Sequence, residues 1–357
     1  MYDVHVVGAG PAGSFAAYTA AVRGKKVLLS EEHPQVGSPV ACSGLVSKSG
    51  LEEMSDLVNY RKITINSLHG AMIYSGKERF VVSAAEGDKA YLFDRRAFDV
   101  LACESAVSEG AKLALSDHVD AASVAAQCVI GADGPNSAMA LGFGFPKIRD
   151  FVITMQADFE MQVEDLHMIS AYIDREKFPG FFGWVIPKGD GSAKVGMGAR
   201  LPCDIRKKYA DFKKLLGIEN KPGESLLSAV IPINMRPRTG IARDGKKIVL
   251  CGDAAGQVKA TTGGGIYFGA SCGRLAGLHF EDPARYESEW KRMYGNDLAM
   301  HGWIYRAMHG FGGSHQIAAA RFLKMAGAEG FLSNFGEMDR VTKTFNLKNL
   351  ARHIASK

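Results

Sequence analysis

Short apolar runs, separated by glycine-rich turns and amphipathic stretches, make up most of the hydrophobic pattern of this chain. The β-branched run Val4–Val7 is followed by a glycine turn, an alanine-rich stretch over residues 14–23 and a second apolar run over residues 27–29. A helical crossover between two short apolar runs is typical of a right-handed βαβ unit with parallel strands. We therefore predict strand, glycine turn, helix and strand at the N-terminus.

The same kinds of segment return further along the chain. Residues 94–110 have apolar side chains at helical core spacing, whereas residues 128–130 and 248–250 are continuous apolar runs. Continuous runs of that length are typical of buried parallel strands. Between residues 151 and 199, alternating apolar and polar positions predict the strands of an antiparallel sheet.

One helix start stands out near the C-terminal end. Asp282 and Pro283 have the order of an N-cap followed by a proline at the first helical position, and the chain after them is predicted to be mostly helical. The whole pattern predicts an α/β fold, in which a β-rich domain interrupts a Rossmann-like dinucleotide-binding domain. The predicted pieces are residues 1–60, 90–150 and 240–282 for the dinucleotide-binding domain, 61–89 and 151–239 for an inserted antiparallel-sheet substrate domain, and 283–357 for a helical C-terminal region.

Composition and charge narrow the function classes. Glycine accounts for 41 of the 357 residues, without a collagen period, and its clusters indicate a backbone that approaches a ligand closely. The net charge of +5 fits an anionic small molecule or an anionic membrane surface, and no motif indicates nucleic acid. Six cysteines without C-x-x-C spacing indicate neither a metal site nor a disulfide framework. With no leader and no apolar run of membrane-spanning length, we expect a cytoplasmic protein, soluble or peripheral.

The first glycine turn has the spacing Gly8-x-Gly10-x-x-Gly13, directly after a strand and before a helix. In that context the glycines permit a tight turn, close approach of a pyrophosphate and close helix–strand packing, while the helix N-terminus favours the anion. Glu31, which follows the second strand, is placed to accept from ribose hydroxyls, and Glu32 is the alternative. The predicted phosphate-binding residues are Gly8, Gly10, Pro11, Ala12 and Gly13.

A second motif, Asp94-Arg95-x-x-Phe98-Asp99, begins the predicted helix over residues 94–110. An arginine at this position can reach a pyrophosphate with two parallel hydrogen bonds. The alternative is an ordinary surface helix with an aspartate N-cap and a solvated arginine. The motif by itself leaves both interpretations open.

Two further motifs follow buried strands. The pair Asp133-Gly134 comes after the strand at residues 128–130, where it is either a ligand contact or a simple turn. The pair Gly252-Asp253 follows the strand at residues 248–250, and its carboxylate is placed to accept from a polyol. The amides of Gly263, Gly264, Gly265 and Ile266, at the start of an apolar helix, are predicted to face an anionic ring edge.

These four motifs, in this order, resemble the FAD-dependent oxidoreductases of the para-hydroxybenzoate hydroxylase and glutathione reductase type. The resemblance covers roughly residues 1–275. It implies FAD as the cofactor, with Glu31 at the adenosine ribose and Arg95 along the pyrophosphate. It also implies that Asp253 holds the ribityl chain or the pyrophosphate, and that Gly264 and Gly265 present amides to the flavin ring. Asp133 would lie near the flavin.

Within that group, two segments resemble the geranylgeranyl reductase family, whose archaeal members saturate the isoprenoid chains of membrane lipids. Residues 179–187 match the P-x-x-Y-x-W-x-F-P pattern at Pro179, Trp184 and Pro187, with Phe182 in place of tyrosine and Ile186 in place of phenylalanine. Residues 39–45 contain the C-x-G segment as Cys42 and Gly44. The resemblance implies transfer of hydride from N5 of reduced flavin to an isoprenoid double bond.

The resemblance also implies roles for particular residues at the substrate side. Cys42 is the candidate proton donor or gate and, with Gly44, a flavin contact, although a buried thiol with no catalytic role has the same sequence pattern. The predicted apolar walls of the substrate cavity are Phe181, Phe182, Trp184 and Tyr267. A plain strand with core aromatics is the alternative for the segment around Trp184.

Other flavoprotein classes stay open at this stage. Residues 182–187 also resemble the W-x-W-x-I-P pattern of flavin-dependent halogenases. An aromatic monooxygenase that uses NADPH and oxygen is another alternative. A FixC-type electron-transfer flavoprotein dehydrogenase is a further alternative, although no cysteine follows Cys272 to hold an iron–sulfur cluster. A lipid-binding module with structural FAD is the non-catalytic alternative. Product analysis separates these classes.

The remaining partners are an electron donor and a membrane. The sequence contains no second G-x-G-x-x-G, so either ferredoxin or NAD(P)H is compatible as the donor. Residues 338–357 carry five basic residues against Asp339, interleaved with Phe345, Leu347, Leu350 and Ile354. A basic amphipathic helix of this kind can lie on an anionic membrane, and an ordinary surface helix is the alternative.

Overall fold

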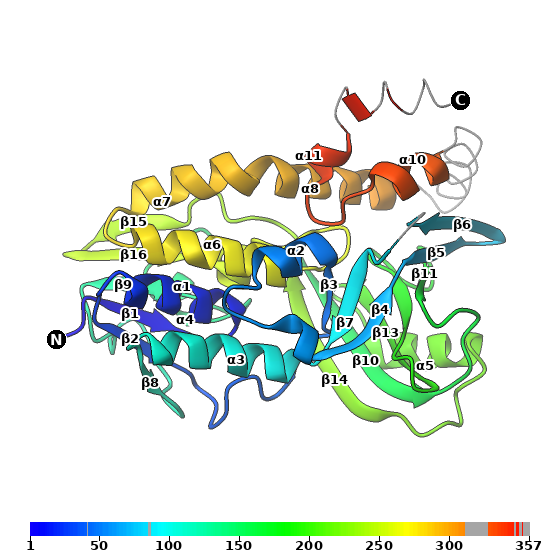
Figure 1. The fold of residues 1–357 in the computed structure, drawn as a ribbon, viewed down its shortest axis with the longest axis horizontal. Helices are drawn as coiled ribbons and strands as arrows, with labels where there is room; N and C mark the ends of the chain where they lie inside the picture. The colour runs from blue at the N-terminus through cyan, green and yellow to red at the C-terminus, as the bar shows by residue number, and fades with distance from the viewer. Residues whose placement is uncertain (41, 85–86, 311–327, 346–347, 350–351, 353–357) are drawn as a thin grey trace.

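The computed structural model describes residues 1–357 apart from 41, 85–86, 311–327, 346–347, 350–351 and 353–357. A mainly parallel sheet with its helices forms one end of the molecule, and a second, larger sheet forms the other (Figure 1). Long helices run along one side of both sheets, and the C-terminal segment lies beside them (Figure 1). This arrangement confirms the predicted α/β fold class.

The first sheet has six strands in the order β15-β16-β9-β1-β2-β8. All its pairs are parallel except β15 with β16, which form an antiparallel pair at one edge. Its strands are β1 (Val4–Val7), β2 (Val27–Ser30), β8 (Lys112–Ala114), β9 (Cys128–Gly131), β15 (Gly240–Arg243) and β16 (Lys246–Leu250).

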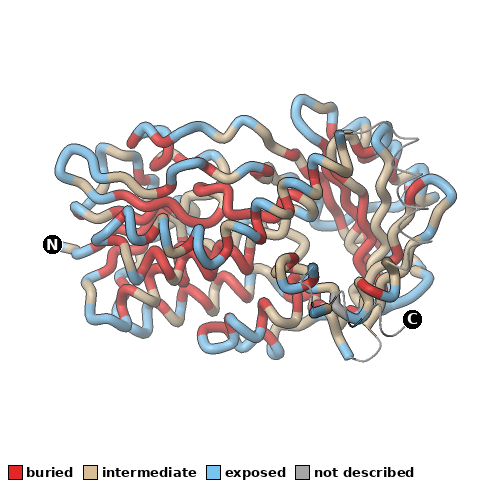
Figure 2. Tube along the Cα trace, turned by 90° about the horizontal axis from the view of Figure 1, so that it is seen from above, coloured by how far each residue is buried: buried red, intermediate tan, exposed pale blue. Residues whose placement is uncertain are grey.

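Both faces of this sheet are covered, which explains the continuous apolar runs in the sequence. Val4 and Val6 face the cluster formed with α1 (Pro11–Val22), α6 (Ile266–His279) and α7 (Pro283–Trp290). Val7 faces a second cluster with α4 (Ala138–Gly142) on the other side. The buried positions run through the strands and along the helices that cover them (Figure 2).

The predicted helices form with small differences at their ends. α1 begins at Pro11 rather than at residue 14, because proline is tolerated at the first helical position, where no intrahelical N–H bond is needed. α3 (Arg95–Ser108) is capped by Asp94, whose side chain accepts from the amide of Ala97 at 3.0 Å. α7 is capped by Asp282 and has proline in its first turn, as predicted.

The second sheet has seven strands in the order β14-β10-β13-β12-β11-β5-β6. The predicted antiparallel pairing holds for β10 with β13, but β11 and β5 run parallel, since β5 enters the sheet from a much earlier part of the chain. One face of the sheet packs against α5 (Ile205–Leu215). Its strands are β5 (Gly70–Ser75), β6 (Glu78–Ser83), β10 (Phe151–Glu160), β11 (Met168–Tyr172), β12 (Gly183–Pro187), β13 (Ser192–Arg200) and β14 (Glu224–Pro232).

The strands of a small third sheet alternate along the chain with strands of the two large sheets. It joins β3 (Leu45–Ser47), β7 (Ala90–Phe93) and β4 (Thr64–Leu68), and so combines segments from both predicted domains. The division of the chain into a cofactor domain and a substrate domain stays a prediction. Short helices α2 (Lys48–Glu53) and η1 (Tyr60–Lys62) follow β3.

The C-terminal part is largely helical within the described residues. A π-helical stretch, η3 (Lys291–Gly295), joins α7 to α8 (Asn296–Gly310), and α10 (Ala328–Phe335) and α11 (Val341–Thr344) follow. The predicted basic helix over 338–357 is described only in part: Leu347, Leu350 and Ile354 lie outside the described residues. Among the described helices, none combines the length and apolar character needed to cross a bilayer.

Candidate active site

Two of the three glycines in the first turn are required by packing. A Cβ atom at Gly13 would overlap the carbonyl oxygen of Gly8, and one at Gly8, whose φ is 99°, would overlap that of Ala132. At Gly10, by contrast, a Cβ atom would meet nothing within 4 Å. Gly10 is the N-cap of α1 and offers no side-chain acceptor, so open space adjoins the electropositive helix end. An anionic group fits there.

The structure distinguishes the two candidate ribose ligands. Glu31 is turned toward the glycine turn, where its Oε2 accepts from the amide of Ala9 at 2.9 Å and its Oε1 accepts from His33 Nδ1 at 2.6 Å. Glu32 is largely exposed and lies 3.4 Å from His118. The position of Glu31 supports its predicted role at the adenosine ribose more than that of Glu32.

Arg95 is anchored by the helix that it begins. Its Nε donates to Asp99 Oδ1 at 2.9 Å, and both side chains are largely buried. Burial would lower the pKa of Arg95, but the nearby Asp99 carboxylate and the Cys42 sulfur raise it, so the guanidinium keeps its charge. A pyrophosphate is the kind of anion that a fixed, charged guanidinium holds well.

The loop between β2 and β3 brings two further predicted residues to Arg95. The Cys42 sulfur is a hydrogen-bond partner of the guanidinium and also accepts from the amide of Gly44 at 3.4 Å. Gly44 has a φ of 77°, and a Cβ atom there would overlap the carbonyl oxygen of Phe93. Cys42, Gly44 and Arg95 therefore form one group, although more than fifty positions separate the loop from the helix.

The two predicted aspartates have different surroundings. Asp133 accepts from Ser137 Oγ at 2.6 Å and from the amide of Met139 at 2.9 Å, so both its oxygens hold the turn before α4. Asp253 lies in the short η2 helix (Gly252–Ala255), and burial raises its pKa to about 6, opposed only by the charge of Arg95. A carboxylate in this state fits a ligand whose hydroxyl groups donate to it.

The glycine loop before α6 lies next to Asp253. A Cβ atom at Gly265 would lie 2.9 Å from Asp253 Oδ1, and the amide of Gly263 donates to the carbonyl oxygen of Lys259 at 2.8 Å. Ile266 begins α6 directly afterwards. Gly134, which follows Asp133, also borders open space. The first glycine turn, Glu31 and the two aspartates thus follow β1, β2, β9 and β16, as in dinucleotide-binding folds. The other predicted cofactor residues lie in the loop before β3, at the start of α3 and in the loop before α6.

Lys259 also forms a buried ion pair that was not predicted from the sequence. Its Nζ lies 2.5 Å from Asp339 Oδ1, both side chains are about 5% exposed or less, and Asp339 also accepts from the hydroxyl of Ser47. This buried pair ties the C-terminal segment to the loop that carries Gly263–Gly265. A single lysine and a single aspartate eighty positions apart give no sequence signal, so the pair was not predictable.

Three of the four predicted wall residues come together in one apolar cluster. The rings of Phe181 and Phe182 lie 4.5 Å apart, and those of Phe182 and Trp184 lie 5.5 Å apart. A Cβ atom at Gly196 of β13 would lie 2.5 Å from Trp184 Cε2, so glycine on that strand makes room for the indole. Phe181 also borders the cofactor loop, since a Cβ at Gly263 would lie 3.3 Å from its Cζ.

The fourth predicted wall residue, Tyr267, is in a different place. Its hydroxyl donates to Glu53 Oε2 at 2.8 Å, and its ring packs edge-on against Phe268 and Tyr294. It belongs to the core cluster under α1 rather than to the cluster of Trp184. Helix periodicity alone does not determine which face of α6 turns toward the second sheet.

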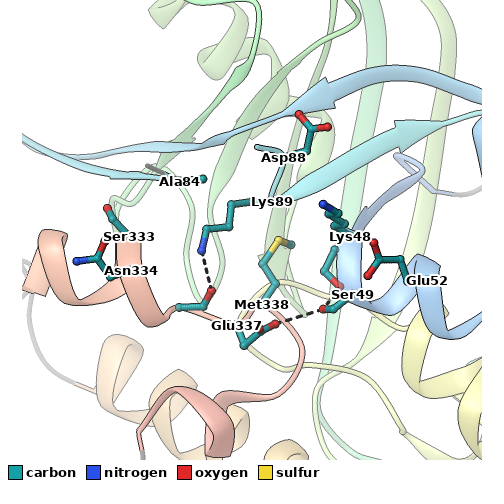
Figure 3. A pocket seen from close by; sticks show the side chains of 12 residues that line it. Lys48, Ser49, Glu52, Ala84, Asp88, Lys89, Ser333, Asn334, Glu337 and Met338 are labelled. Carbon is teal, nitrogen blue, oxygen red and sulfur yellow. Dashed lines mark hydrogen bonds between the residues drawn. The ribbon is translucent and has the colours of Figure 1, made fainter. Parts of the chain in front are cut away.

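A polar pocket of about 350 Å³ lies between α2, β7 and the C-terminal segment (Figure 3). Lys89 Nζ lies 3.4 Å from the carbonyl oxygen of Gly336 across it, and Ser49 donates to Glu337 at 3.2 Å. None of the predicted site residues lines this pocket. Met338 lines it and also packs against the cluster of Trp184, so the pocket adjoins the aromatic wall.

His301 gives the stability of this region a pH dependence. It is 3% exposed, its Nδ1 lies 2.8 Å from Thr261 Oγ1, and burial together with the charge of Lys259 lowers its pKa to about 4. In the unfolded chain the pKa of histidine is about 6.5, so the unfolded state takes up a proton first as the pH falls. The stabilisation is complete above pH 6.5 and is lost progressively below it.

We expect this histidine to contribute a loss of about 2 kcal/mol of unfolding free energy on going from pH 7.5 to pH 5. Urea unfolding of the parent and of His301→Asn at both pH values measures it. Between pH 7.5 and pH 5, His301→Asn should lose about 2 kcal/mol less unfolding free energy than the parent. Equal losses in the two proteins would contradict the assignment.

Comparison with known proteins shows which family the chain belongs to. A family model described as FAD dependent oxidoreductase matches residues 3–129. Digeranylgeranylglycerophospholipid reductase from Methanocaldococcus jannaschii is 30% identical over 345 residues, covering 84% of this chain and 85% of that protein. Digeranylgeranylglycerophospholipid reductase 2 from Methanopyrus kandleri is 32% identical over 338 residues, covering 82% of this chain and 83% of that protein.

A solved structure shows the same fold. The geranylgeranyl bacteriochlorophyll reductase-like protein from Thermoplasma acidophilum superposes with a TM-score of 0.71 at 24% identity, covering 100% of this chain and 96% of that one. The fold, the glycine turn and the family match define an FAD-dependent oxidoreductase of the para-hydroxybenzoate hydroxylase type. The similarity to the curated reductases extends over most of both chains. The chain belongs to the digeranylgeranylglycerophospholipid reductase family, within the geranylgeranyl reductase group.

The residues present fit FAD. The open space at Gly10 admits a pyrophosphate, and Asp253 is a buried carboxylate suited to the hydroxyl groups of a ribityl chain. Arg95 supplies a fixed positive charge that interacts with both Asp253 and Cys42. These three features belong to separate segments that only the fold brings together.

Proposed function

We propose that this protein is an FAD-dependent reductase that saturates carbon–carbon double bonds in the isoprenoid chains of membrane lipids. The observation that carries the proposal is the aromatic wall of Phe181, Phe182 and Trp184, which borders the cofactor loop at Gly263. An isolated alkene offers no polar group to bind, so an enzyme acting on it needs a dry apolar surface beside the cofactor. The sequence similarity to the reductases supports the same assignment.

Reduced FAD supplies the hydride in this chemistry. The roles of the protein follow from the site: Arg95 and the N-terminus of α1 hold the pyrophosphate, and Asp253 and Glu31 hold the two sugar-like portions. The aromatic wall orients the isoprenoid chain and excludes water. Cys42 is the proposed proton donor to the second alkene carbon, because its loop lies next to Arg95 and hence next to the cofactor.

The proposal extends to the partners. The substrate is an unsaturated isoprenoid lipid, and the electrons come from a low-potential donor, either ferredoxin or NAD(P)H. Contact with the cytoplasmic membrane face supplies the lipid, and the exposed Phe345 in the basic C-terminal segment supports this contact.

The direct test uses the purified flavoprotein, reduced without oxygen and mixed with digeranylgeranylglycerophospholipid. We expect reoxidation of the flavin and mass gains in the lipid that correspond to pairs of hydrogen atoms. Cys42→Ser should lower the rate strongly while FAD stays bound. Unchanged lipid, or hydroxylated or halogenated aromatic products, would overturn the proposal.

A further inference from the structure

Gln156 is a buried polar residue in the face of the second sheet that carries the aromatic wall. It is 2% exposed and lies on β10, opposite Gly196 of β13. Its chain neighbours Met155 and Ala157 point to the other face, into the cluster under α5. The alternation of a strand therefore places Gln156 on the side of Trp184 and the cofactor loop.

The carboxamide of Gln156 has a defined orientation. Its Oε1 lies 2.9 Å from Trp184 Nε1 and 2.5 Å from Ser43 Oγ. The indole N–H only donates, so the atom of Gln156 that faces it must be the oxygen, and Ser43 must donate to that oxygen as well. The Nε2 of Gln156 is buried and has no hydrogen-bond partner among the described residues.

One oxygen atom thus joins two parts of the site that are far apart in the sequence. Ser43 lies between Cys42 and Gly44 in the loop beside Arg95, and Trp184 belongs to the aromatic wall. A glutamine kept only for packing would not leave a buried N–H group unpaired, because an apolar side chain of similar volume avoids that cost. The residue therefore has a role other than stabilising the sheet.

We propose that Gln156 is a positioning residue, which fixes the distance between the Cys42 loop and the aromatic wall by accepting hydrogen bonds from Ser43 and Trp184 at once. It acts through these two neighbours and does not itself transfer a proton or bind the reacting carbon atoms. This inference adds a residue role to the proposed function, and its test by lipid reduction rests on that function. Its test by chemical labelling of Cys42 does not require the protein to reduce lipid.

The test compares Gln156→Leu with two variants that each remove one of its donors. Ser43→Ala removes the hydroxyl group, and Trp184→Phe removes the indole N–H while keeping a ring in the wall. The matched control is Thr154→Val, because the Thr154 side chain is buried on the same face of the same strand but donates only to the backbone carbonyl oxygen of Ala229. All variants are purified as the FAD-bound protein.

The first readout is the alkylation rate of Cys42 by iodoacetamide, followed on its own peptide by mass spectrometry. Without the hydrogen bond from Ser43 the loop moves more freely, so the rate should rise about threefold to tenfold in Gln156→Leu and in Ser43→Ala. Combining these two changes should produce no further increase, since both break the same bond. The control should label at the parent rate, and the melting temperature of Gln156→Leu should stay within about 4 °C of the parent.

The second readout is the steady-state reduction of the lipid. We expect kcat to fall about tenfold in Gln156→Leu with KM changed less than twofold, because the thiol is misplaced while the apolar wall still binds the chain. Unchanged Cys42 labelling in Gln156→Leu, or additive effects with Ser43→Ala, would overturn the inference. Changed labelling in a protein that reduces no lipid would instead contradict the proposed function and leave the positioning role standing.

Discussion

Replacing Gly10 with valine should abolish tight FAD binding and leave the stability of the apoprotein unchanged, whereas the same replacement at Gly13 should strongly destabilise the apoprotein. At Gly10 the backbone has a φ of −69°, which valine adopts without strain, and the added side chain enters open space in front of α1. That space is where the pyrophosphate of FAD must lie to reach the helix N-terminus. At Gly13 the added Cβ would overlap the Gly8 carbonyl oxygen, which is backbone and cannot rotate away.

The two substitutions are expected to change different quantities, FAD affinity at Gly10 and stability of the apoprotein at Gly13. For Gly10→Val the dissociation constant of FAD should rise about 100-fold, equivalent to about 2.7 kcal/mol, with the apoprotein melting as the parent does. For Gly13→Val the apoprotein should lose about 4 kcal/mol or more of unfolding free energy. Flavin fluorescence titration and thermal unfolding of the apoproteins measure the two quantities. Parent-like FAD affinity in Gly10→Val would show that the pyrophosphate binds elsewhere.

The buried pair of Lys259 and Asp339 predicts the second large effect. Lys259→Met leaves the Asp339 carboxylate buried without its cation, and the expected loss of unfolding free energy is about 3–5 kcal/mol. Changing both residues, as Lys259→Met with Asp339→Leu, removes the stranded charge and should recover much of that loss. Urea unfolding of the two single variants and of the double variant measures this pattern.

A matched control exists on the surface of the same protein. Lys25 and Glu281 form an ion pair of 2.7 Å in which the side chains are 28% and 55% exposed, against 5% and 4% in the buried pair. Breaking it with Lys25→Met should cost less than about 1 kcal/mol. Limited proteolysis should also reveal the C-terminal segment as more accessible in Lys259→Met than in the control. A loss as small as that of the control would mean that water reaches the buried pair.

The helix starts and the buried strands were predictable, because interactions between residues close together in the chain determine them. Proline at the first turn, aspartate caps at positions 94 and 282, and continuous apolar strands each act within a few residues. The glycine turn was predictable from its spacing between a strand and a helix, and Gly13 is required by a local contact with the carbonyl oxygen of Gly8. The contact that requires Gly8 is made with the distant Ala132 and could not be predicted. FAD as the cofactor follows from these local features and their order.

The substrate-binding side was only partly predictable, because it depends on contacts between residues far apart in the sequence. Phe181, Phe182 and Trp184 lie within four positions of the chain, so their grouping was predictable. Tyr267, in contrast, lies on a helix whose rotation is set by packing against α1. Gln156 gave no signal, because a single glutamine in a strand pattern is unremarkable until Ser43 and Trp184 are placed beside it.

The sequence by itself determined the order of strands, turns and helices, the cofactor class and the apolar character of the substrate side, because each of these depends on residues close together in the chain. The tertiary structure alone decided that Glu31 and not Glu32 turns inward, that Cys42 lies at Arg95, and that Asp339 reaches Lys259. Those pairings join residues between 22 and 80 positions apart in the chain. Their partners are selected by burial and by the need to satisfy every buried charge, which no local pattern records.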